Sequence, residues 1–161
     1  MKILRAKIIN KFRSHTPRGF YHVIRGHTGV DFEAKYVPLE SPVTGKVILL
    51  LSQPGMGQCM YIEDSLGSVH LFAHLKEFKK KINESVQRKE IIAITGNTGR
   101  ESTGPHLHYE IIKPHPDTLT EKIMLRTQLP VKGYNADPIK YLKDLYFKFH
   151  VNLDGDVIAS I

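Results

Sequence analysis

The chain has 161 residues, a length that fits one domain on the usual range of about 100–200 residues per domain. Hydrophobic residues make up 41% of it and charged residues 24%, and this globular composition excludes collagen-like, low-complexity and disordered chains. Lysine and arginine number 23 against 16 aspartates and glutamates, so the formal net charge is +7. That charge favours an anionic partner: nucleic acid, an acidic membrane surface or an anionic cell wall.

Cysteine usage and apolar runs narrow the class of protein further. Cys59 is the only cysteine, which excludes an intramolecular disulfide and a cysteine-rich zinc site, so any metal must be held by nitrogen and oxygen. Arg5 and Lys7 interrupt the apolar residues of the first ten positions, so we expect no secretory signal. The longest apolar run, Val47–Leu51, is far shorter than the ~18 residues of a membrane span, and none is expected.

The predicted elements are mostly short strands. Ile3–Ile9 has strand character, and the polar, glycine-containing stretch Arg13–Gly26 is predicted to be a long loop. Further short apolar runs are Val30–Phe32, Lys46–Leu51, Cys59–Glu63, Val69–Ala73, Ile91–Thr95 and Leu107–Ile112. Glycine-containing turns such as Gly55–Gly57 and Gly96–Gly104 separate several of these runs. The pattern predicts a mainly antiparallel β-sheet or β-sandwich.

One short helix is expected near the C-terminal end. Apolar residues at helical spacing run through Pro138–Phe147, with Asp137 as the predicted N-cap and Pro138 at the first helical position. The preceding stretch Pro114–Asn135 has two early prolines and mixed polarity, so we expect an irregular excursion there. Val151–Ile161 is predicted to form a strand or a tail.

Histidines and one carboxylate gather in three places along the chain. His27 and Asp31 are four positions apart, an even number that would place both on the same face of an extended chain. His106 and His108 have the two-residue period that puts both imidazoles on one side of a strand. His74 directly follows a predicted strand. Such residues can supply a nitrogen and oxygen site of the kind that zinc accepts.

Each of these features also has a purely structural interpretation. A His-x-x-x-Asp spacing is common by chance and is more often a solvated hydrogen-bonded pair than a metal site. A His-x-His pair on a strand is about as often structural as functional. A lone histidine such as His74 is more often a capped residue of the core than a catalyst. Taken separately, none of the three features decides the function.

The order of the features and the residues around them carry more information. The motifs are Gly26-His27-Thr28-Gly29-Val30-Asp31-Phe32, Ser41-Pro42-Val43-Thr44-Gly45-Lys46-Val47, Gly55-Met56-Gly57, Leu71-Phe72-Ala73-His74-Leu75, Gly96-Asn97-Thr98-Gly99 and Ser102-Thr103-Gly104-Pro105-His106-Leu107-His108-Tyr109-Glu110. In this order they closely resemble the lysostaphin-like (M23, LytM-type) zinc metallopeptidases, from about Ile9 to Tyr141.

The resemblance implies a fold and a domain organisation. The implied fold is a mainly antiparallel β-sheet or sandwich of the LytM type, a duplicated hybrid motif with long active-site loops and one short C-terminal helix. We expect a single peptidase domain over residues 1–161, with the motif-bearing core at about 9–141 and a C-terminal extension at 142–161.

The resemblance also implies a role for each of the histidines and the aspartate. His27, Asp31 and His108 would hold one Zn²⁺ per chain, with water in the fourth position. His106 and His74 correspond to the two non-ligand histidines of the family, which activate that water and stabilise the tetrahedral intermediate and the leaving amine. The implied reaction is direct hydrolysis of an amide.

Tyr21 and three turns match the family less closely. Tyr21 stands where active members often carry a tyrosine that donates to the developing oxyanion, and the alternative is that it covers the edge of the core. The glycine usual after the N-terminal aromatic residue is missing at Phe12-Arg13. Asn83-Glu84 and Lys89-Glu90 stand where glycines commonly shape two further turns. Asparagine tolerates the left-handed region, whereas the lysine has no such explanation.

The family acts on the peptide part of bacterial peptidoglycan. The implied function is therefore a zinc-dependent endopeptidase that hydrolyses amide bonds in the stem peptides or cross-bridges of the wall, and a charge of +7 suits that anionic substrate. The protein would act at the bacterial cell wall, in the periplasm or outside the cell. Without a visible signal, the sequence fits a phage-delivered or virion-associated endolysin and equally a fragment of a larger exported protein.

Two other classes of function remain. Some members of the fold have lost zinc ligands and serve as non-catalytic domains that bind the wall or activate other hydrolases, whereas every expected ligand is present here. Nucleic-acid binding is supported by charge alone, without a recognised motif. We expect a monomer whose partners are peptidoglycan peptides, with no nucleic acid and no membrane span.

Overall fold

The computed structural model describes residues 1–14, 26–113 and 135–148. The elements in chain order are the 3₁₀ turn η1 (Ile3–Arg5), the strands β1 (Ile8–Asn10), β2 (Val30–Glu33), β3 (Pro38–Glu40), β4 (Gly45–Gln53), β5 (Gly57–Asp64), β6 (Val69–Leu75), β7 (Glu77–Phe78), β8 (Ser85–Val86), β9 (Ile91–Ile94), β10 (His106–Ile112) and β11 (Asn135–Ala136), and the helix α2 (Pro138–Lys148). Most of the predicted strands and the helix are therefore present.

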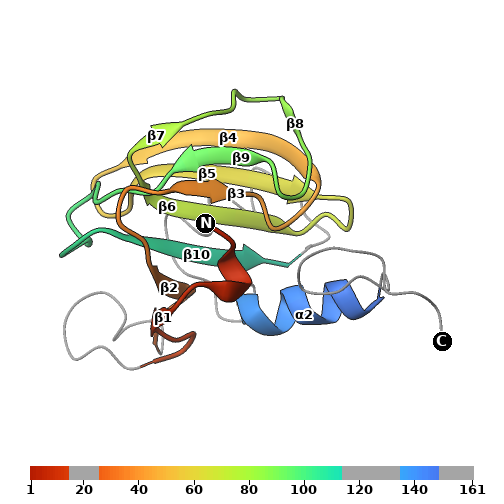
Figure 1. Ribbon diagram of the computed structural model, residues 1–161, viewed down its shortest axis with the longest axis horizontal. Helices are drawn as coiled ribbons and strands as arrows, with labels where there is room; N and C mark the ends of the chain where they lie inside the picture. Colours follow the sequence, from red (N-terminus) through yellow and green to blue (C-terminus); the bar gives the residue numbers. More distant parts are fainter. Residues whose placement is uncertain (15–25, 114–134, 149–161) are drawn as a thin grey trace.

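The strands form two sheets with antiparallel pairing throughout the described residues. The larger sheet has eight strands in the order β1-β2-β10-β6-β5-β4-β8, with β11 paired to β10. A smaller sheet has the order β3-β9-β7 and lies in front of the larger one in Figure 1. The mainly β, antiparallel fold class that the sequence predicts is confirmed.

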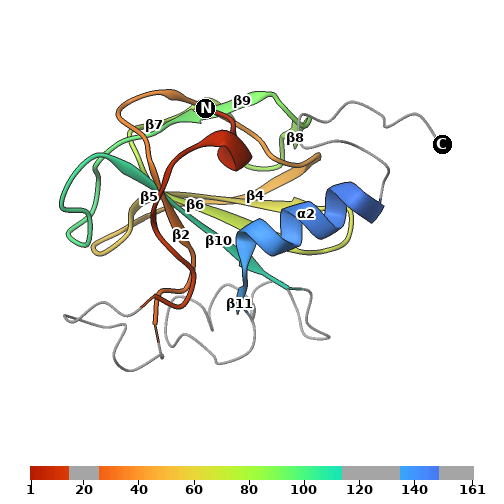
Figure 2. The same cartoon turned by 60° about the horizontal axis from the view of Figure 1, so that its bottom comes forward.

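The main hydrophobic core fills the space between the two sheets and helix α2. The large sheet contributes alternate residues such as Phe72 and Tyr109, whose rings stack with centroids 5.0 Å apart. The small sheet contributes Leu39, and the helix contributes Leu142, both fully buried. Figure 2 shows α2 lying along β10 beside the large sheet. This packing fixes the central strands, and their opposite face carries the histidines discussed below.

Helix α2 begins as its sequence predicts. The carboxylate Oδ1 of Asp137 accepts hydrogen bonds from the backbone N–H of Ile139 at 2.9 Å and of Lys140 at 3.2 Å, so two of the free N–H groups of the first turn are satisfied. Of the helices in the described ranges, none is long and apolar enough to cross a membrane. The predicted excursion Pro114–Asn135 and the predicted terminal segment Val151–Ile161 fall almost entirely outside the described residues.

The strand predicted over Ile3–Ile9 is wrong. Only Ile8–Asn10 forms a strand, and the chain before it makes a 3₁₀ turn closed by hydrogen bonds from the N–H of Arg5 and Ala6. The apolar residues do not serve one strand face, because Ile3 is buried in the core while Ile9 is half exposed. The side chain of Ile3 packs into the core at this point. The residues before Ile8 therefore form a turn instead of continuing the strand.

Three residues adopt positive φ where the family resemblance would place glycine. They are Arg13 with φ 61°, Asn83 with φ 69° and Lys89 with φ 70°. The turns thus keep the left-handed conformation although the glycines are missing. A side chain in this region is strained relative to glycine by roughly 1 kcal/mol, which the surrounding hydrogen bonds must offset.

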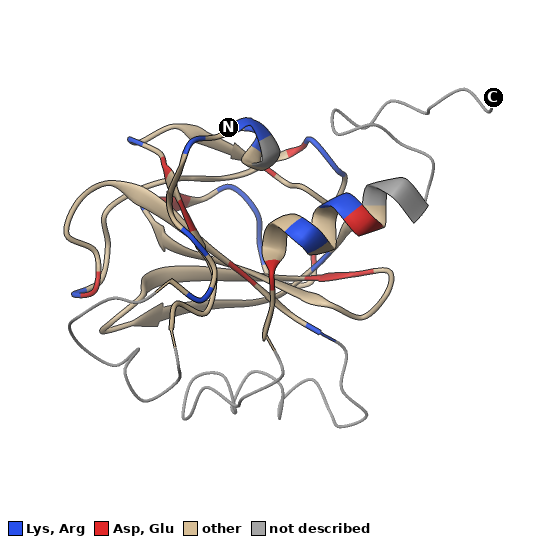
Figure 3. Ribbon diagram, turned by 90° about the horizontal axis from the view of Figure 1, so that it is seen from below, with Lys and Arg blue, Asp and Glu red and all other residues tan. Residues whose placement is uncertain are grey.

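Charged side chains are spread over many elements. Figure 3 shows lysines and arginines on the N-terminal segment, on turns and on α2, with acidic residues among them. On α2 the exposed Lys140 pairs with Asp144 at 2.5 Å. An exposed pair of this kind contributes little to stability, because water and salt screen it.

Candidate active site

The pairing of β2 with β10 brings two of the predicted ligands together. In their register Asp31 lies opposite His108, and Val30 lies opposite Tyr109. The preceding turn packs so closely on β10 that a Cβ on Gly29 would lie 2.3 Å from the carbonyl oxygen of Tyr109. Only glycine fits there, which explains the middle residue of the His-x-Gly-x-Asp motif.

His27 reaches the same point from outside the strand. Strand β2 begins at Val30, so the expectation that His27 and Asp31 share one face of an extended chain is wrong in its geometry. The two side chains nevertheless meet, with Nε2 of His27 3.1 Å from Oδ1 of Asp31. The turn at Gly29, rather than strand alternation, produces this contact.

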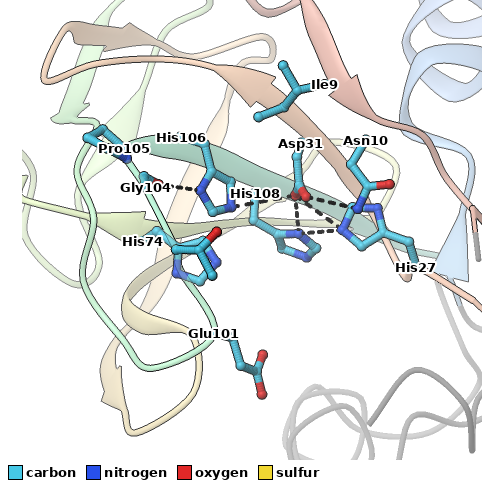
Figure 4. A pocket seen from close by; sticks show the side chains of 11 residues that line it. Ile9, Asn10, His27, Asp31, His74, Glu101, Gly104, Pro105, His106 and His108 are labelled. Carbon is cyan, nitrogen blue, oxygen red and sulfur yellow. Dashed lines mark hydrogen bonds and ion pairs between the residues drawn. The ribbon is translucent and has the colours of Figure 1, made fainter. Parts of the chain in front are cut away.

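Three potential ligand atoms converge at this point. Nε2 of His27 lies 3.0 Å from Nδ1 of His108, and that nitrogen lies 2.7 Å from Oδ1 of Asp31. Figure 4 shows these three side chains directed toward one another at one side of the pocket. Within the described ranges, His27, Asp31 and His108 are the group whose ligand atoms lie close enough together to hold one metal ion.

The outer hydrogen bonds determine which nitrogen of each imidazole carries the proton. Nδ1 of His27 lies 3.2 Å from the carbonyl oxygen of Lys11, which can only accept, so Nδ1 donates and Nε2 keeps its lone pair. Nε2 of His108 lies 2.7 Å from a carboxylate oxygen of Glu110, which leaves the lone pair of His108 on Nδ1.

The donor set therefore suits a divalent cation. Two imidazole lone pairs and one carboxylate oxygen face one another, and three acceptors at such distances need a proton or a cation between them. Two nitrogens and one oxygen, with the fourth side open to a pocket, are the ligands and the arrangement typical of a catalytic zinc site. Asn10 donates its side-chain N–H to Oδ2 of Asp31 at 3.2 Å, so Oδ1 is the carboxylate oxygen that points at the histidines.

The electrostatics of the metal-free site favour an ion pair. Burial opposes charge on Asp31, but the hydrogen bond from His108 and the charge of that imidazole outweigh it and hold the pKa of the carboxyl far below its ordinary range. Burial likewise opposes charge on His108, but hydrogen bonds to Asp31 and Glu110 outweigh it and raise the pKa of the imidazole to about 9. In the absence of a metal, the site thus holds a proton where a cation would bind.

A β-bulge aims His74 into the pocket. Regular alternation along β6 would place His74 on the core face with Phe72, but the register with β5 shifts between Phe72 and Leu75. His74 has φ 59°, and its Nδ1 donates to the carbonyl oxygen of Thr98 at 2.8 Å. Nε2 is therefore the unprotonated nitrogen that carries the lone pair. Burial lowers the pKa of His74 to about 4, so the ring is neutral near pH 7.

His106 completes the cluster from the first position of β10. Its Nδ1 lies 2.8 Å from the carbonyl oxygen of Gly104, so Nδ1 donates there and Nε2 carries the lone pair. Nε2 lies 3.9 Å from Oδ1 of Asp31, and the ring centroid of His106 is 4.6 Å from that of His74. Between His106 and His108, Leu107 turns into the core, as the two-residue period predicts.

These side chains line one pocket of about 440 Å³, within the usual range for ligand sites. The remaining lining residues are Ile9, Asn10, Glu101, Thr103, Gly104 and Pro105. Five of the six side chains singled out in the sequence lie here, whereas Tyr21 falls outside the described residues. Glu110 and Asn10 were missed, and neither spacing nor composition marks a glutamate or an asparagine as the partner of a ligand.

Comparison with known proteins identifies a family of peptidases, in agreement with a catalytic metal site at these residues. Residues 25–121 match peptidase family M23. The peptidoglycan DD-endopeptidase ShyA of Vibrio cholerae is 36% identical over 90 residues, which are 53% of this chain and 20% of that protein. The chain thus spans about a fifth of the length of such curated relatives.

Solved structures of similar proteins extend the likeness to the fold. The match to the structure of LytU covers 86% of this chain and 86% of that one, with a TM-score of 0.66 and 26% identity. A zinc-containing peptidase from Vibrio cholerae is 33% identical, with a TM-score of 0.56, and the match covers 66% of this chain and 33% of that one.

Proposed function

This chain belongs to peptidase family M23, and from that premise we propose that it is a zinc-dependent endopeptidase that hydrolyses amide bonds in the peptides of bacterial peptidoglycan. The observation that carries the proposal is the meeting of His27, Asp31 and His108 beside His74 and His106 in one pocket. Side chains suited to metal binding and side chains suited to proton transfer thus lie next to each other.

Three side chains are assigned to the metal. His27 through Nε2, Asp31 through Oδ1 and His108 through Nδ1 would hold one Zn²⁺, because their lone pairs already face one another. When bound, zinc supplies Lewis-acid chemistry, which lowers the pKa of water and polarises a carbonyl oxygen. The carbonyl oxygen of Lys11 would keep the imidazole of His27 in the required tautomer.

The other two histidines are assigned to proton transfer. His74 and His106 each donate through Nδ1 to a backbone carbonyl, so each presents Nε2 to the pocket. The neutral His74 can accept a proton from the attacking water at pH 7. Either imidazole, once protonated, can donate to the carbonyl oxygen of the substrate or to the departing amine. Tyr21 remains a proposed oxyanion donor on the resemblance alone.

The substrate assignment rests on the relatives and on charge. ShyA is named as a peptidoglycan endopeptidase, and a net charge of +7 favours approach to an anionic wall. We accordingly place the site of action at the bacterial cell wall and assign the domain to residues 1–161, acting as a monomer. Delivery by a phage particle and origin as part of a larger exported protein remain the two interpretations given above.

The experiment is digestion of purified cell walls followed by mass spectrometry of the released muropeptides. Gram-positive and Gram-negative walls, each incubated with the zinc-loaded protein, should yield peptides cut at one type of amide bond, which identifies the bond. A protein that binds one zinc per chain and wall material but releases no peptide would instead be a non-catalytic wall-binding domain. Salt-sensitive retention on DNA without cleavage of walls would favour nucleic-acid binding.

A further inference from the structure

Glu110 is a buried carboxylate that the assigned catalytic roles do not use. It lies on β10 two residues after His108, and its exposed fraction is 0%. A buried carboxylate is costly unless donors surround it. The donors that surround Glu110 therefore indicate the role of this carboxylate.

Within the described part of the chain, donors from three segments converge on Glu110. Oε1 accepts from Nε2–H of His108 at 2.7 Å and from the hydroxyl of Thr28 at 2.5 Å. Oε2 accepts from the side-chain N–H of Asn135 at 2.9 Å. Glu110 thus joins the ligand strand β10 to the turn that carries His27 and to the short strand that leads into α2.

The contact with His108 fixes both the tautomer and the orientation of that ring. A carboxylate accepts only, so the proton of His108 stays on Nε2 and the lone pair on Nδ1. Nδ1 is the atom that faces Asp31 and His27. Were the proton on Nδ1 instead, a donor would point at the metal position and the ligand would be lost.

We propose that Glu110 is a positioning residue for the metal, which holds His108 in its ligand tautomer and draws the turn at Thr28 against it. This inference rests on the proposed metal-binding function and deepens it. Glu110 touches neither the pocket nor the proposed reacting atoms. It acts through His108, and its loss should weaken metal binding about 10- to 100-fold, which is typical of partners that orient a metal ligand.

The chain offers a matched control. Asp64 is also paired with a buried histidine, since its Oδ2 lies 3.0 Å from Nε2 of His70. That pair belongs to the same large sheet, but His70 faces Tyr109 and Tyr141 instead of the proposed metal ligands. Removing either carboxylate disturbs a buried pair, and only one of them should alter metal affinity.

The test compares the zinc affinities of the wild type, Glu110→Gln and Asp64→Asn by competition with a chromogenic chelator. The unfolding of each metal-free protein in urea is recorded alongside. Glu110→Gln should bind zinc about 10- to 100-fold more weakly, whereas Asp64→Asn should keep wild-type affinity even if it is less stable. Equal affinities of wild type and Glu110→Gln would overturn the inference while leaving the proposed function intact. A wild type that binds no zinc would refute the metal-binding function itself.

A second measurement does not depend on a variant that folds. Nitrogen-15 NMR of the imidazoles in the zinc-loaded wild type reports which ring nitrogen of each histidine is protonated. The proton of His108 should be on Nε2, with the downfield shift of a hydrogen bond to a carboxylate. A proton on Nδ1 of His108 would overturn the positioning role.

Discussion

Asp31 and His108 face each other across the β2–β10 pair, with Oδ1 of the carboxylate 2.7 Å from Nδ1 of the imidazole. His106 is only two residues away on the same strand, but its Nε2 lies 3.9 Å from that carboxylate oxygen. The two histidines of one His-x-His motif are therefore not equivalent. One belongs with the proposed ligands, and the other lies beside His74.

The first prediction separates these roles by mutation. His108→Ala should lose both zinc and activity, because two remaining ligands hold the metal poorly. His106→Ala should retain zinc and lose activity by about 10²- to 10⁴-fold, as expected for removal of a general acid or base. Zinc content and kcat of the two purified variants provide the check. Equal loss of zinc in both variants would show that this division of roles is wrong.

The second prediction concerns the stability of the metal-free protein as a function of pH. The pKa of His108 is raised to about 9, so its contribution to stability is fully present below the ordinary histidine value of about 6.5 and is lost as the pH rises through 9. The pKa of Asp31 is lowered, so its contribution is present above about pH 4 and is lost on further acidification.

Urea unfolding of metal-free wild type and of His108→Gln isolates the histidine contribution. The difference in unfolding free energy between the two proteins should be largest near pH 5 to 6 and should decrease toward pH 9. A difference that stays constant between pH 6 and pH 9 would mean that His108 is not held as an imidazolium beside Asp31.

Part of this site could be predicted from the sequence because β-strands have a simple period, whereas the roles of its residues were implied by the family resemblance. The spacing of His106 and His108 predicted one shared face with Leu107 in the core, and the structure agrees. Asp137 before Pro138 predicted the helix start, since both residues act through local backbone geometry. Structural features that depend only on residues close together in the sequence can be predicted in this way.

What depends on distant contacts could not be predicted. The bulge that turns His74 out of the core face has no local signal, because it arises from the register between β5 and β6. Glu110 gains its role from Thr28 and Asn135, which are far away in the sequence. The apolar residues after Met1 suggested a strand, whereas Ile3 is buried in the core and the segment forms a 3₁₀ turn closed by its own backbone hydrogen bonds.

The third prediction uses Lys89, which adopts φ 70° without being glycine. Lys89→Gly should raise the free energy of unfolding by about 0.5–1 kcal/mol, because relief of the left-handed strain exceeds the added entropy of the unfolded chain. Urea denaturation at constant zinc gives the value. Lys89→Ala is the control, since it keeps a Cβ in the same conformation and should bring no gain. A glycine variant less stable than the alanine variant would contradict the strain argument.

The fourth prediction concerns the contact between α2 and the sheet. The hydroxyl of Tyr141 lies 2.8 Å from Oδ2 of Asp64 and 2.7 Å from Oγ of Ser68. Tyr141→Phe should lower the free energy of unfolding by about 1 kcal/mol and leave zinc content unchanged. Tyr36→Phe, at a half-exposed position, should change neither quantity. Loss of zinc in Tyr141→Phe would show that helix docking and the metal site are coupled.

The central claim is that a metal held by the three converging ligands is required for amide hydrolysis. The most direct measurement is kcat/KM on a purified crosslinked muropeptide for the protein as isolated, after verified removal of zinc by a chelator, and after restoration of one zinc per chain. We predict activity in the first sample, none above background in the second and full recovery in the third. Undiminished hydrolysis by the verified metal-free protein would contradict the account.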